Sequence, residues 1–345
     1  MLPIRNRCEC LQKKNEMKAM ILAAGFGSRL QPLTDHCPKP LFPVCNRPLL
    51  QHSLDFLERE GIGQIAINLH HLAQAVVDGY PTRSYNNLDL RFFIEEKILG
   101  TAGGIRAAQE FLDEGSPFLA LNSDILSDVN IKDVLKFHKE RQSALTLVVR
   151  RYGPSESYRP IEIDATGRIV NFLGAIPPDV KETGERVMFT GIQIMEPEIF
   201  ARIPAGKFCG TTEDIFPQMI REGNPVYGYL HEGYWIDAGT RETYLQANFD
   251  VLDKAVSGQM QKSQDPEIIH PVLIGKHCEL SPSASIGPYV ILGDHCKVGS
   301  GTKIERSICW ERSEIAENCH IEGSVISGLI APGSVVKGSL VGKHE

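Results

Sequence analysis

A strand followed directly by a glycine loop opens the patterned part of this chain. The stretch reads Lys18-Ala19-Met20-Ile21-Leu22-Ala23-Ala24-Gly25-Phe26-Gly27-Ser28-Arg29-Leu30-Gln31-Pro32-Leu33-Thr34. Its first seven residues form a mainly apolar run of strand length, and Gly25 closes that run. Backbone N–H groups of a glycine loop after a first strand can converge on an anion. This beginning predicts an α/β fold with an anion site at the end of its first strand.

From Lys18 to about Gly258, predicted strands and helices alternate. After the glycine loop come strands at 64–69, 88–95 and 118–121, with helices at 74–78 and 101–113 between them. Such alternation is typical of a doubly wound, mainly parallel, Rossmann-like sheet with helices on both faces. A hairpin is expected over 161–172, and a helix at about 241–252 closes this domain.

The end of the chain has a different periodicity. Apolar residues recur every six positions, at Ile274, Leu280, Ile286, Leu292, Val298 and Ile304. A six-residue period is typical of a solenoid in which each hexad forms one short strand and about 18 residues close one coil. The pattern resembles the left-handed parallel β-helix of hexapeptide-repeat proteins. The register slips after Trp310 and resumes at Ile315 and Ile321, so we expect about four coils.

These patterns divide the 345 residues into two domains, which agrees with a usual domain length of roughly 150 residues. Residues 1–17 are expected to be a disordered extension, 18–258 the α/β domain, 259–270 a polar linker and 271–345 the β-helix. The open end of the last coil leaves backbone groups unpaired. We therefore expect the β-helix to form a homo-oligomer and to take no part in the chemistry.

Two His-Cys pairs stack in this β-helix. His277-Cys278 and His295-Cys296 are 18 residues apart, which places them on adjacent coils about 4.8 Å apart. Such a cluster could suit zinc. However, both cysteines share their place in the hexad with small residues that should face inward: Ala284, Val290 and Thr302. Core packing is the favoured interpretation of both cysteines.

Composition excludes several classes of partner. Thirty-six basic and 43 acidic side chains give a net charge of −7, and no basic run suits a phosphate backbone, so nucleic acid is not expected. No apolar run approaches the roughly 18 residues of a membrane span, and no signal peptide is recognisable. Nine scattered cysteines do not suggest a disulfide framework. We expect a cytoplasmic protein.

Two cations flank the glycine loop. Arg29 follows it, and Lys39 lies between prolines in Pro38-Lys39-Pro40-Leu41. The prolines fix the backbone and so hold the lysine at a set distance from the loop. Leu30 stands where a dinucleotide-binding fingerprint has its third glycine, and no Gly-Lys-Ser/Thr follows to form a P-loop. Two fixed cations beside an amide nest suit a triphosphate.

The pattern Gly-x-Gly-x-Arg-Leu-x-Pro-Leu-Thr, followed by Pro-Lys-Pro-Leu, resembles the signature of sugar-1-phosphate nucleotidylyltransferases, also called nucleotide-sugar pyrophosphorylases. The resemblance covers roughly residues 18 to 255, and a C-terminal left-handed β-helix is a common appendage in that family. It implies that Arg29 and Lys39 are catalytic. It also implies that the first strand and its loop bind the nucleotide, through Leu22, Ala23, Ala24, Gly25 and Gly27.

The resemblance further implies a Mg²⁺ site made of two carboxylates, since charge must be neutralised as pyrophosphate leaves. Asp124 follows the apolar stretch 118–121, at the edge where ligands bind in open α/β sheets. It matches the first metal ligand of the family, although Ser123 replaces the usual glycine. Asp237, within Tyr234-Trp235-Ile236-Asp237-Ala238-Gly239, matches the second. Without the family context, an aspartate at a strand end is usually a cap or turn residue.

A third segment fits the family loop that receives the base. It reads Glu95-Glu96-Lys97-Ile98-Leu99-Gly100-Thr101-Ala102-Gly103-Gly104, and its glycines allow the backbone to come close to a ligand. Glu96, Gly100, Thr101 and Ala102 are assigned to the nucleotide, although Thr101 could simply cap the next helix. An acidic side chain here can accept from guanine N1–H and N2–H₂ together, whereas uracil and thymine offer one donor flanked by acceptors. The loop therefore favours GTP.

The sugar side departs from the family pattern. Many relatives carry Glu-Lys-Pro after the hairpin, where the lysine meets the sugar phosphate, but this chain has Phe172-Leu173-Gly174-Ala175. Arg159 precedes the hairpin and could replace the missing charge, or it could be an ordinary surface arginine. Thr190, Gly191 and Trp235 fall where relatives contact the sugar.

The resulting prediction is a Mg²⁺-dependent transferase in which a sugar-1-phosphate oxygen attacks the α-phosphorus of a nucleoside triphosphate. Mannose-1-phosphate with GTP is the specific prediction, while heptose-1-phosphate guanylyl transfer and N-acetylmuramate-1-phosphate uridylyl transfer remain open. A non-catalytic nucleotide-sugar sensor is the alternative from another class. Acyl transfer by the β-helix is disfavoured, because four imperfect coils leave little room for an acyl donor and His320 has no partnering motif.

Overall fold

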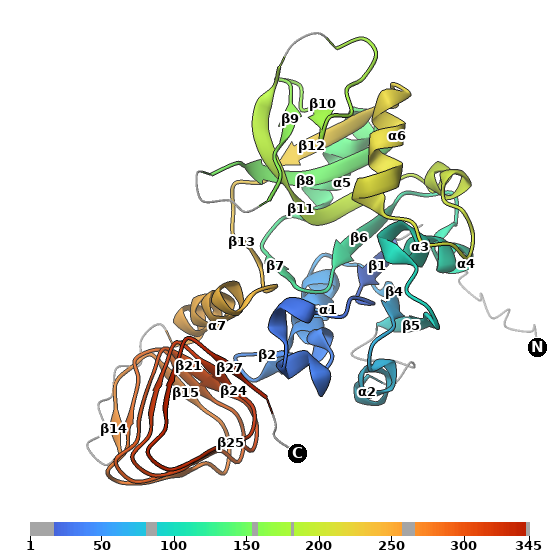
Figure 1. Cartoon of the computed structure of the whole chain (residues 1–345). Helices are drawn as coiled ribbons and strands as arrows, with labels where there is room; N and C mark the ends of the chain where they lie inside the picture. Colours follow the sequence, from blue (N-terminus) through green and yellow to red (C-terminus); the bar gives the residue numbers. More distant parts are fainter. Residues whose placement is uncertain (1–16, 81–87, 154–157, 181–182, 257–265, 343–345) are drawn as a thin grey trace, which may run out of the picture.

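The computed structural model describes residues 17–80, 88–153, 158–180, 183–256 and 266–342. They form an α/β domain followed by a β-helix (Figure 1). The predicted extension lies outside the described residues except for Met17, which packs against the core of the α/β domain. The predicted linker lies outside them as far as residue 265.

A nine-stranded mixed sheet forms the α/β domain. Four strands are parallel neighbours, in the order β6 (Phe118–Asn122), β1 (Ala19–Leu22), β4 (Gln64–Leu69) and β5 (Asp89–Ile94). The side chains of β1, β4 and β6 are almost all buried, as expected for parallel strands covered on both faces. The three strands predicted after the glycine loop are confirmed.

The other half of the sheet is organised around the long strand β11 (Glu185–Met195). It pairs antiparallel with β6, β8 (Leu145–Arg151) and β9 (Ile161–Ile163), and β9 pairs with β10 (Ile169–Phe172) as the predicted hairpin. β12 (Val226–Leu230) lies parallel to β8. The Rossmann-like class is confirmed, with the parallel order kept in the half that carries the glycine loop.

Helices cover both faces of this sheet (Figure 1). One face packs against α3 (Gly100–Ala107), α4 (Gln109–Leu112) and α6 (Phe216–Arg221), and the other against α1 (Leu49–Arg59), α2 (Ala73–Gly79) and α5 (Ile131–Glu140). The helix predicted at 101–113 is split at Ala108, whose backbone leaves the helical region. The helix predicted near 241–252 is α7 (Arg241–Val256). Within the described ranges, no helix combines the length and the apolar character needed to cross a bilayer.

The β-helix consists of three parallel sheets whose strands stack coil on coil (Figure 1). The first sheet contains β14 (Glu267–Ile268), β17 (Ser285–Ile286), β20 (Lys303–Glu305), β23 (His320–Glu322) and β26 (Val335–Lys337). The second contains β15 (Val272–Ile274), β18 (Val290–Leu292), β21 (Ser307–Cys309), β24 (Val325–Ile326) and β27 (Leu340–Val341). The third contains β16 (Glu279–Leu280), β19 (Lys297–Val298), β22 (Glu314–Ile315) and β25 (Leu329–Ile330). The predicted left-handed β-helix is confirmed, with Ile286, Ile304 and Ile321 buried in one inward column.

The coils become shorter along the β-helix. Paired residues are 18 positions apart at Ser285 and Lys303, 17 apart at Lys303 and His320, and 15 apart at His320 and Val335. A smaller number of residues per coil with the same three sheets means tighter corners. The connections between the three sheets therefore contain fewer residues toward the C-terminal end.

The predicted place of the register slip is wrong by one corner. Ser307 already pairs with Val290, 17 positions back, so the slip precedes Trp310. The missing residue is lost at Arg306, which turns the corner between β20 and β21 alone with φ of 46°. Sequence periodicity could not locate the slip, because the apolar Trp310 happens to stand one full hexad after Ile304.

The two cysteines of the His-Cys pairs have different surroundings. Cys296 is buried, and its thiol donates to the carbonyl of Trp310 at 3.1 Å. Cys278 lies half-buried in the first coil, with its thiol 3.2 Å from the carbonyl oxygen of Gly293. The rings of His277 and His295 stack with centroids 5.0 Å apart. The packing interpretation fits Cys296 fully and Cys278 in part.

The β-helix packs against the segment that follows the glycine loop. This segment contains 3-10 turns at Leu33–Asp35 and Lys39–Leu41 and the small hairpin of β2 (Pro43–Val44) and β3 (Arg47–Pro48). Phe42 meets Trp310 edge-on with ring centroids 4.6 Å apart, and the indole N–H of Trp310 donates to the Tyr244 hydroxyl at 3.1 Å. The amide of Asn46 donates to the carbonyl of Leu292 at 2.8 Å. The β-helix therefore shares a core with the α/β domain, in addition to any role in self-association.

Candidate active site

The glycine loop lies at the carboxyl end of β1 and is fixed from two sides. The N–H of Ala23 donates to Oδ1 of Asn68, at the end of the neighbouring strand β4, at 2.9 Å. Gly27 has φ of 65°, and a Cβ there would lie 2.8 Å from the side chain of Thr34. Glycine is required at this position both by the left-handed backbone and by the close packing. The 3-10 turn Ser28–Leu30 then carries Arg29.

A cleft of about 320 Å³ opens beside the loop. It is bounded by the ends of β1, β4 and β6, by the turn around Lys39 and by the start of α3. Its lining includes predicted nucleotide-binding residues from both segments: Leu22, Ala23, Ala24, Gly25, Gly27, Gly100 and Thr101. Arg29, Lys39 and Asp124 line it as well. The structure thus gathers residues from three distant segments at the edge where α/β sheets bind ligands.

Lys39 is held in the cleft by its surroundings. Its backbone begins a 3-10 turn between Pro38 and Pro40, and its side chain is only 10% exposed. Its Nζ forms an ion pair with Asp124, and it lies 3.9 Å from Oδ1 of Asp237. The lysine therefore points at both carboxylates that the family resemblance assigns to the metal.

A two-stranded sheet places these carboxylates side by side. Asp124 follows β6 and precedes β7 (Ile125–Ser127), and β7 pairs antiparallel with β13 (Trp235–Asp237). The register sets Asp237 opposite Ile125, and the N–H of Ala238 donates to the carbonyl of Asp124 at 2.9 Å. Two aspartates that are remote in sequence are thereby held next to each other at the floor of the site.

The electrostatics of this pair fit a divalent cation. Burial raises the pKa of Asp237, and the negative charge of Asp124 raises it further. Oδ1 of Asp237 is buried and accepts no hydrogen bond, and the Arg29 guanidinium stays 3.9 Å from the other oxygen. Adjacent carboxylates that repel each other, one with an unsatisfied buried oxygen, are the kind of ligand set that a hard cation such as Mg²⁺ takes. Asp124 and Asp237 would hold that cation.

An aromatic cluster adjoins Asp237. The hydroxyl of Tyr158 donates to Oδ2 of Asp237, and burial together with this carboxylate raises the pKa of the tyrosine. Tyr158 meets Trp235 edge-on at 6.0 Å, and the guanidinium of Arg150 lies 5.4 Å from the centre of the Trp235 ring. The indole N–H of Trp235 donates to the carbonyl of Thr190 at 2.9 Å. This cluster leads from the carboxylates toward the residues predicted to meet the sugar.

The predicted base loop divides its two glutamates between different roles. Glu95 is buried, and its oxygens accept from the Asn68 amide at 2.7 Å and from the Leu99 N–H at 2.8 Å. Glu96 is exposed and is not among the residues that line the cleft. The assignment of Glu96 to the base therefore stays a prediction.

The start of α3 is anchored from behind the cleft. Gly100 has φ of 74°, and a Cβ there would lie 2.6 Å from the carbonyl oxygen of Cys209. Ala102 is fully buried and donates its N–H to the same carbonyl at 3.0 Å. The hydroxyl of Thr101 accepts from the N–H of Thr211 at 2.8 Å, so it does not act as the simple helix cap considered above.

The remaining predicted sugar residues lie in and beside β11. The hydroxyl of Thr190 is buried and donates to the carbonyl of Val148 at 2.7 Å, so only its backbone faces Trp235. Gly191 has φ of 80°, and a Cβ there would lie 2.7 Å from the amide nitrogen of Asn122, which lines the cleft. Arg159 is exposed. The structure brings Gly191 and Trp235 toward the site and leaves Arg159 at the surface.

Comparison with known protein families shows which family this chain belongs to. A sequence model described as nucleotidyl transferase matches residues 18–254, and one described as the GMPPB C-terminal domain matches residues 268–344. The chain belongs to the nucleotidyl transferase family. The first match contains Arg29, Lys39, Asp124 and Asp237 and so covers the whole of the site described above.

This nucleotidyl transferase is similar along most of its length to curated enzymes of nucleotide-sugar formation. UTP–glucose-1-phosphate uridylyltransferase from Synechocystis is 29% identical, with 90% of this chain and 87% of that protein covered. Mannose-1-phosphate guanylyltransferase from Mycobacterium tuberculosis is 25% identical, with 89% and 84% covered. Mannose-1-phosphate guanyltransferase from Aspergillus oryzae is 29% identical, with 90% and 86% covered. The chain is a sugar-1-phosphate nucleotidylyltransferase.

Solved structures agree on the fold of the nucleotidyl transferase domain. HddC from Yersinia pseudotuberculosis superposes with a TM-score of 0.58 at 23% identity, covering 68% of this chain and 99% of that one. The same protein in complex with GMP-PN gives a TM-score of 0.57. At this identity the likeness establishes the fold alone.

Sequence reasoning missed four residues of this nucleotidyl transferase site: Asn68, Asn122, Tyr158 and Arg150. A signal existed for the two asparagines, because each stands at or near the end of an apolar strand at the edge where ligands bind, as Asp124 does. Tyr158 and Arg150 carry no such signal. They reach the site only through contacts with Asp237 and Trp235 that no local pattern reveals.

Proposed function

We propose that this enzyme transfers a guanylyl group from GTP to mannose-1-phosphate, giving GDP-mannose and pyrophosphate. The observation that supports it most is the adjacency of Asp124, Asp237 and Lys39 beside the cleft of the glycine loop. Nucleotidyl transfer depends on positioning and charge, and this site combines a pair of metal-binding carboxylates with fixed cations and an amide cradle. Relatives named for mannose-1-phosphate and a guanylyl group cover most of the chain.

In the proposed reaction, a phosphate oxygen of the sugar-1-phosphate attacks the α-phosphorus of GTP. The bond from that phosphorus to the α,β-bridging oxygen breaks, and pyrophosphate leaves with the electron pair. Lys39 stabilises charge on the transferred phosphoryl group, while Arg29 and the amides of Gly25 to Gly27 hold the departing pyrophosphate. Asp124 and Asp237 would hold Mg²⁺, which would supply further positive charge to the phosphate oxygens.

Guanine recognition is assigned to the loop that contains Glu96, Gly100, Thr101 and Ala102. Glu95 is already engaged by Asn68 and Leu99, so Glu96 is the carboxylate of this loop that remains for a ligand. In this proposal the exposed side chain of Glu96 turns toward the cleft and accepts from N1–H and N2–H₂ of guanine. A uracil base would place a carbonyl oxygen against the same carboxylate.

The sugar phosphate is assigned to Arg159, Gly191, Trp235 and the backbone of Thr190. Arg150 joins them as a second candidate for the cation that replaces the missing lysine, since its guanidinium is held against Trp235. Arg150 is only partly exposed, which favours a fixed position over that of the exposed Arg159. Only one of the two needs to neutralise the phosphate.

The test is a matrix of nucleoside triphosphates against sugar-1-phosphates with Mg²⁺, read by release of pyrophosphate. GTP with mannose-1-phosphate is expected to give the highest kcat/KM. A higher kcat/KM with heptose-1-phosphate, or with UTP and N-acetylmuramate-1-phosphate, would show that the proposed substrates are wrong and that the proposed reaction is right. Binding of nucleotide-sugars with no pyrophosphate release from any pair would instead identify a sensor. Asp237→Asn serves as the inactive control.

We also propose that the protein acts in the cytoplasm as a homo-oligomer formed through the last coils of the β-helix. The seven cysteines of the described ranges are all free thiols, which suits a reducing compartment. Leu329 and Val335 are 61% and 67% exposed on these coils. Replacing both with lysine should lower the mass measured by light scattering and leave nucleotidyl transfer intact. An unchanged mass would exclude this contact.

A further inference from the structure

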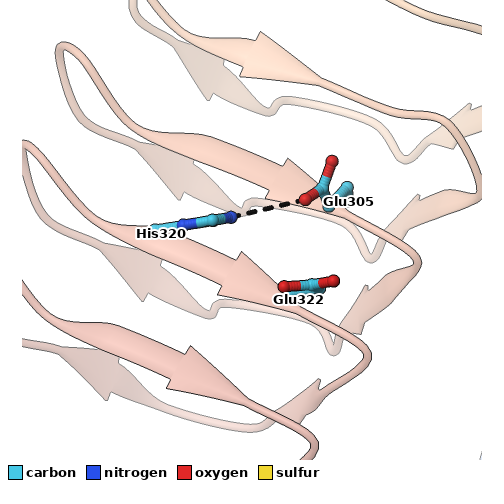
Figure 2. Close-up of side chains that lie close together, drawn as sticks. All are labelled: Glu305, His320 and Glu322. Atoms are coloured by element: carbon cyan, nitrogen blue, oxygen red, sulfur yellow. Dashed lines mark hydrogen bonds and ion pairs between the residues drawn. The ribbon is translucent and has the colours of Figure 1, made fainter.

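A second group of metal-ligating side chains lies far from the cleft, on the outer face of the β-helix. Figure 2 shows Glu305, His320 and Glu322 on the stacked strands β20 and β23. Glu305 and Glu322 face each other across the two coils in parallel register, and His320 stands two residues before Glu322. One ligand atom from each residue lies within 4.8 Å of the other two. None of the three lines the nucleotide cleft.

The separations suit a transition-metal ion. Nε2 of His320 lies 3.4 Å from Oε1 of Glu305. Two ligands of a tetrahedral ion with bonds of 2.0–2.1 Å are about 3.3–3.4 Å apart, so this pair already has the spacing of ligands. Rotation of the Glu322 side chain can bring its oxygen to a third position. One imidazole nitrogen with two carboxylates favours zinc, cobalt or nickel over magnesium, which prefers oxygen ligands.

Two lysines orient the carboxylates without taking the oxygen that faces His320. Nζ of Lys303 lies 2.9 Å from Oε2 of Glu305, and Nζ of Lys337 lies 2.7 Å from Oε2 of Glu322. Oε1 of Glu305 is the oxygen directed at the histidine. Contacts from an outer shell that fix the orientation of ligands are characteristic of metal sites. The lysines can therefore remain in place when an ion binds.

We propose that Glu305, His320 and Glu322 bind a divalent transition-metal ion, with water completing the coordination. The ion ties two successive coils together where paired residues change from 17 to 15 positions apart. Solvent reaches the site directly, because the side chains of Glu305 and His320 are 23% and 35% exposed. The site is independent of the nucleotidyl transfer proposed for the cleft.

The test uses the full chain with Asp124→Asn and Asp237→Asn, so that the carboxylates of the cleft do not contribute. Calorimetric titration with Zn²⁺ alone, without nucleotide, is expected to show one equivalent bound. His320→Ala and Glu322→Gln should each weaken binding at least tenfold. Titration with Co²⁺ should give strong visible bands of a four-coordinate ion, and these bands should be absent in His320→Ala.

Matched controls lie on neighbouring parts of the β-helix. His295→Ala removes another histidine of the β-helix, and Glu314→Gln breaks the ion pair of Glu314 with Lys297. Neither residue belongs to the proposed site, so neither variant should change the affinity for Zn²⁺. His320→Gln, checked by circular dichroism, replaces the alanine variant if that variant does not fold. No Zn²⁺ binding at millimolar concentration would show that the three residues form an ion-pair ladder only. Binding that survives loss of His320, or a thiolate-to-cobalt band, would place the ion elsewhere and overturn the proposal.

Discussion

Lys39 and Asp124 form an ion pair whose side chains are only 10% and 18% exposed. In the absence of substrates, the cation proposed to act on the phosphoryl group is thus neutralised by a proposed metal ligand. Asp237 keeps its buried Oδ1 without a hydrogen bond beside them. Arrival of a divalent cation and a triphosphate would let Asp124 exchange the lysine for the metal, and Lys39 exchange the aspartate for phosphate.

Asp237→Asn and Asp124→Asn should separate activity from stability. Both changes should lower kcat by roughly a thousandfold or more, because each removes half of the charge proposed to bind the metal. Burial and the charge of Asp124 raise the pKa of Asp237 above that of an aspartate in the unfolded chain. At a pH above the unfolded value, the charge of Asp237 therefore lowers the stability of the folded protein. At pH 7 without metal, Asp237→Asn should therefore raise Tm, by about 1–2 °C for each 1 kcal/mol gained in a chain of this length.

The Asp124→Asn variant should be destabilised by about 1–2 kcal/mol, since it breaks the partly buried ion pair of Lys39. Urea unfolding and pyrophosphate release, measured on the same preparations, give both quantities. Near-normal turnover of both variants at saturating Mg²⁺ would show that the carboxylates do not hold the metal. A lower Tm for Asp237→Asn would contradict the repulsion inferred from its position.

Trp310→Ala should destabilise the whole protein, although Trp310 belongs to the β-helix. The substitution removes the edge-on contact with Phe42 and the hydrogen bond to Tyr244, and large-to-small changes of a buried tryptophan cost about 3–5 kcal/mol. Trp310→Phe keeps a smaller aromatic ring and loses the N–H, which should cost about 1–3 kcal/mol, less than the alanine change. Denaturant unfolding checks both values. Equal stability of the two variants would show that the ring contact contributes nothing.

Arg150→Ala and Arg159→Ala test which arginine replaces the missing lysine. Loss of the effective cation should raise KM for the sugar-1-phosphate about tenfold or more and leave KM for GTP nearly unchanged, as expected for a charge-assisted contact worth about 1.5–3 kcal/mol. Arg151→Ala is the control, because that arginine pairs with Glu185 and Glu232 at the surface. A rise in KM for GTP alone would show that the arginine contacts GTP and not the sugar-1-phosphate.

His138 should make the fold sensitive to acid. It is buried in α5 with Nδ1 2.8 Å from the Thr146 hydroxyl and Nε2 3.1 Å from Glu196, and burial lowers its pKa below the usual 6.5. A lowered pKa means that the neutral ring is favoured in the folded state, so stability is complete above the unfolded pKa and is lost as pH falls below about 6.5, by up to about 1.4 kcal/mol per pH unit. His138→Gln should flatten that part of the curve of unfolding free energy against pH.

Deletion of residues 1–16 should change neither Tm nor activity. Met17 and Lys18, the first of the described residues, contact the core: the ammonium of Lys18 donates to the carbonyl of Phe111 at 2.6 Å. We assign no role to the residues before them. Differential scanning fluorimetry of the shortened protein checks this, and a drop of several degrees would show that the segment is docked.

The parts of the fold that sequence predicted best are those with local patterns. The strand at 64–69 is an apolar run between glycines and polar residues, and its bounds were predicted to the residue. The direction of β11 could not be predicted, because antiparallel and parallel neighbours differ in pairing and not in composition. The one-residue corner at Arg306 was hidden for a similar reason, since a deletion in one coil shifts the register without changing the type of residue that faces inward.

The candidate site divides in the same way. Arg29 and Lys39 stand in a sequence motif, and the family resemblance that this motif carries singles out Asp124 and Asp237. The pairing of β7 with β13, which brings the two aspartates together, is a tertiary contact and leaves no local trace. Tyr158 and Arg150 owe their positions to Asp237 and Trp235, and the engagement of Glu95 by Asn68 depends on the neighbouring strand.

The β-helix is not a detachable module. Leu30 and Phe42 of the segment around Lys39, Tyr244 of α7, and Ile291 and Trp310 of the β-helix belong to one hydrophobic cluster. If this β-helix were exchanged for that of a distant relative, the buried Phe42 and Tyr244 would pack against side chains that do not fit them. A substitution in the coils of the β-helix can therefore change the packing of the segment that carries Lys39.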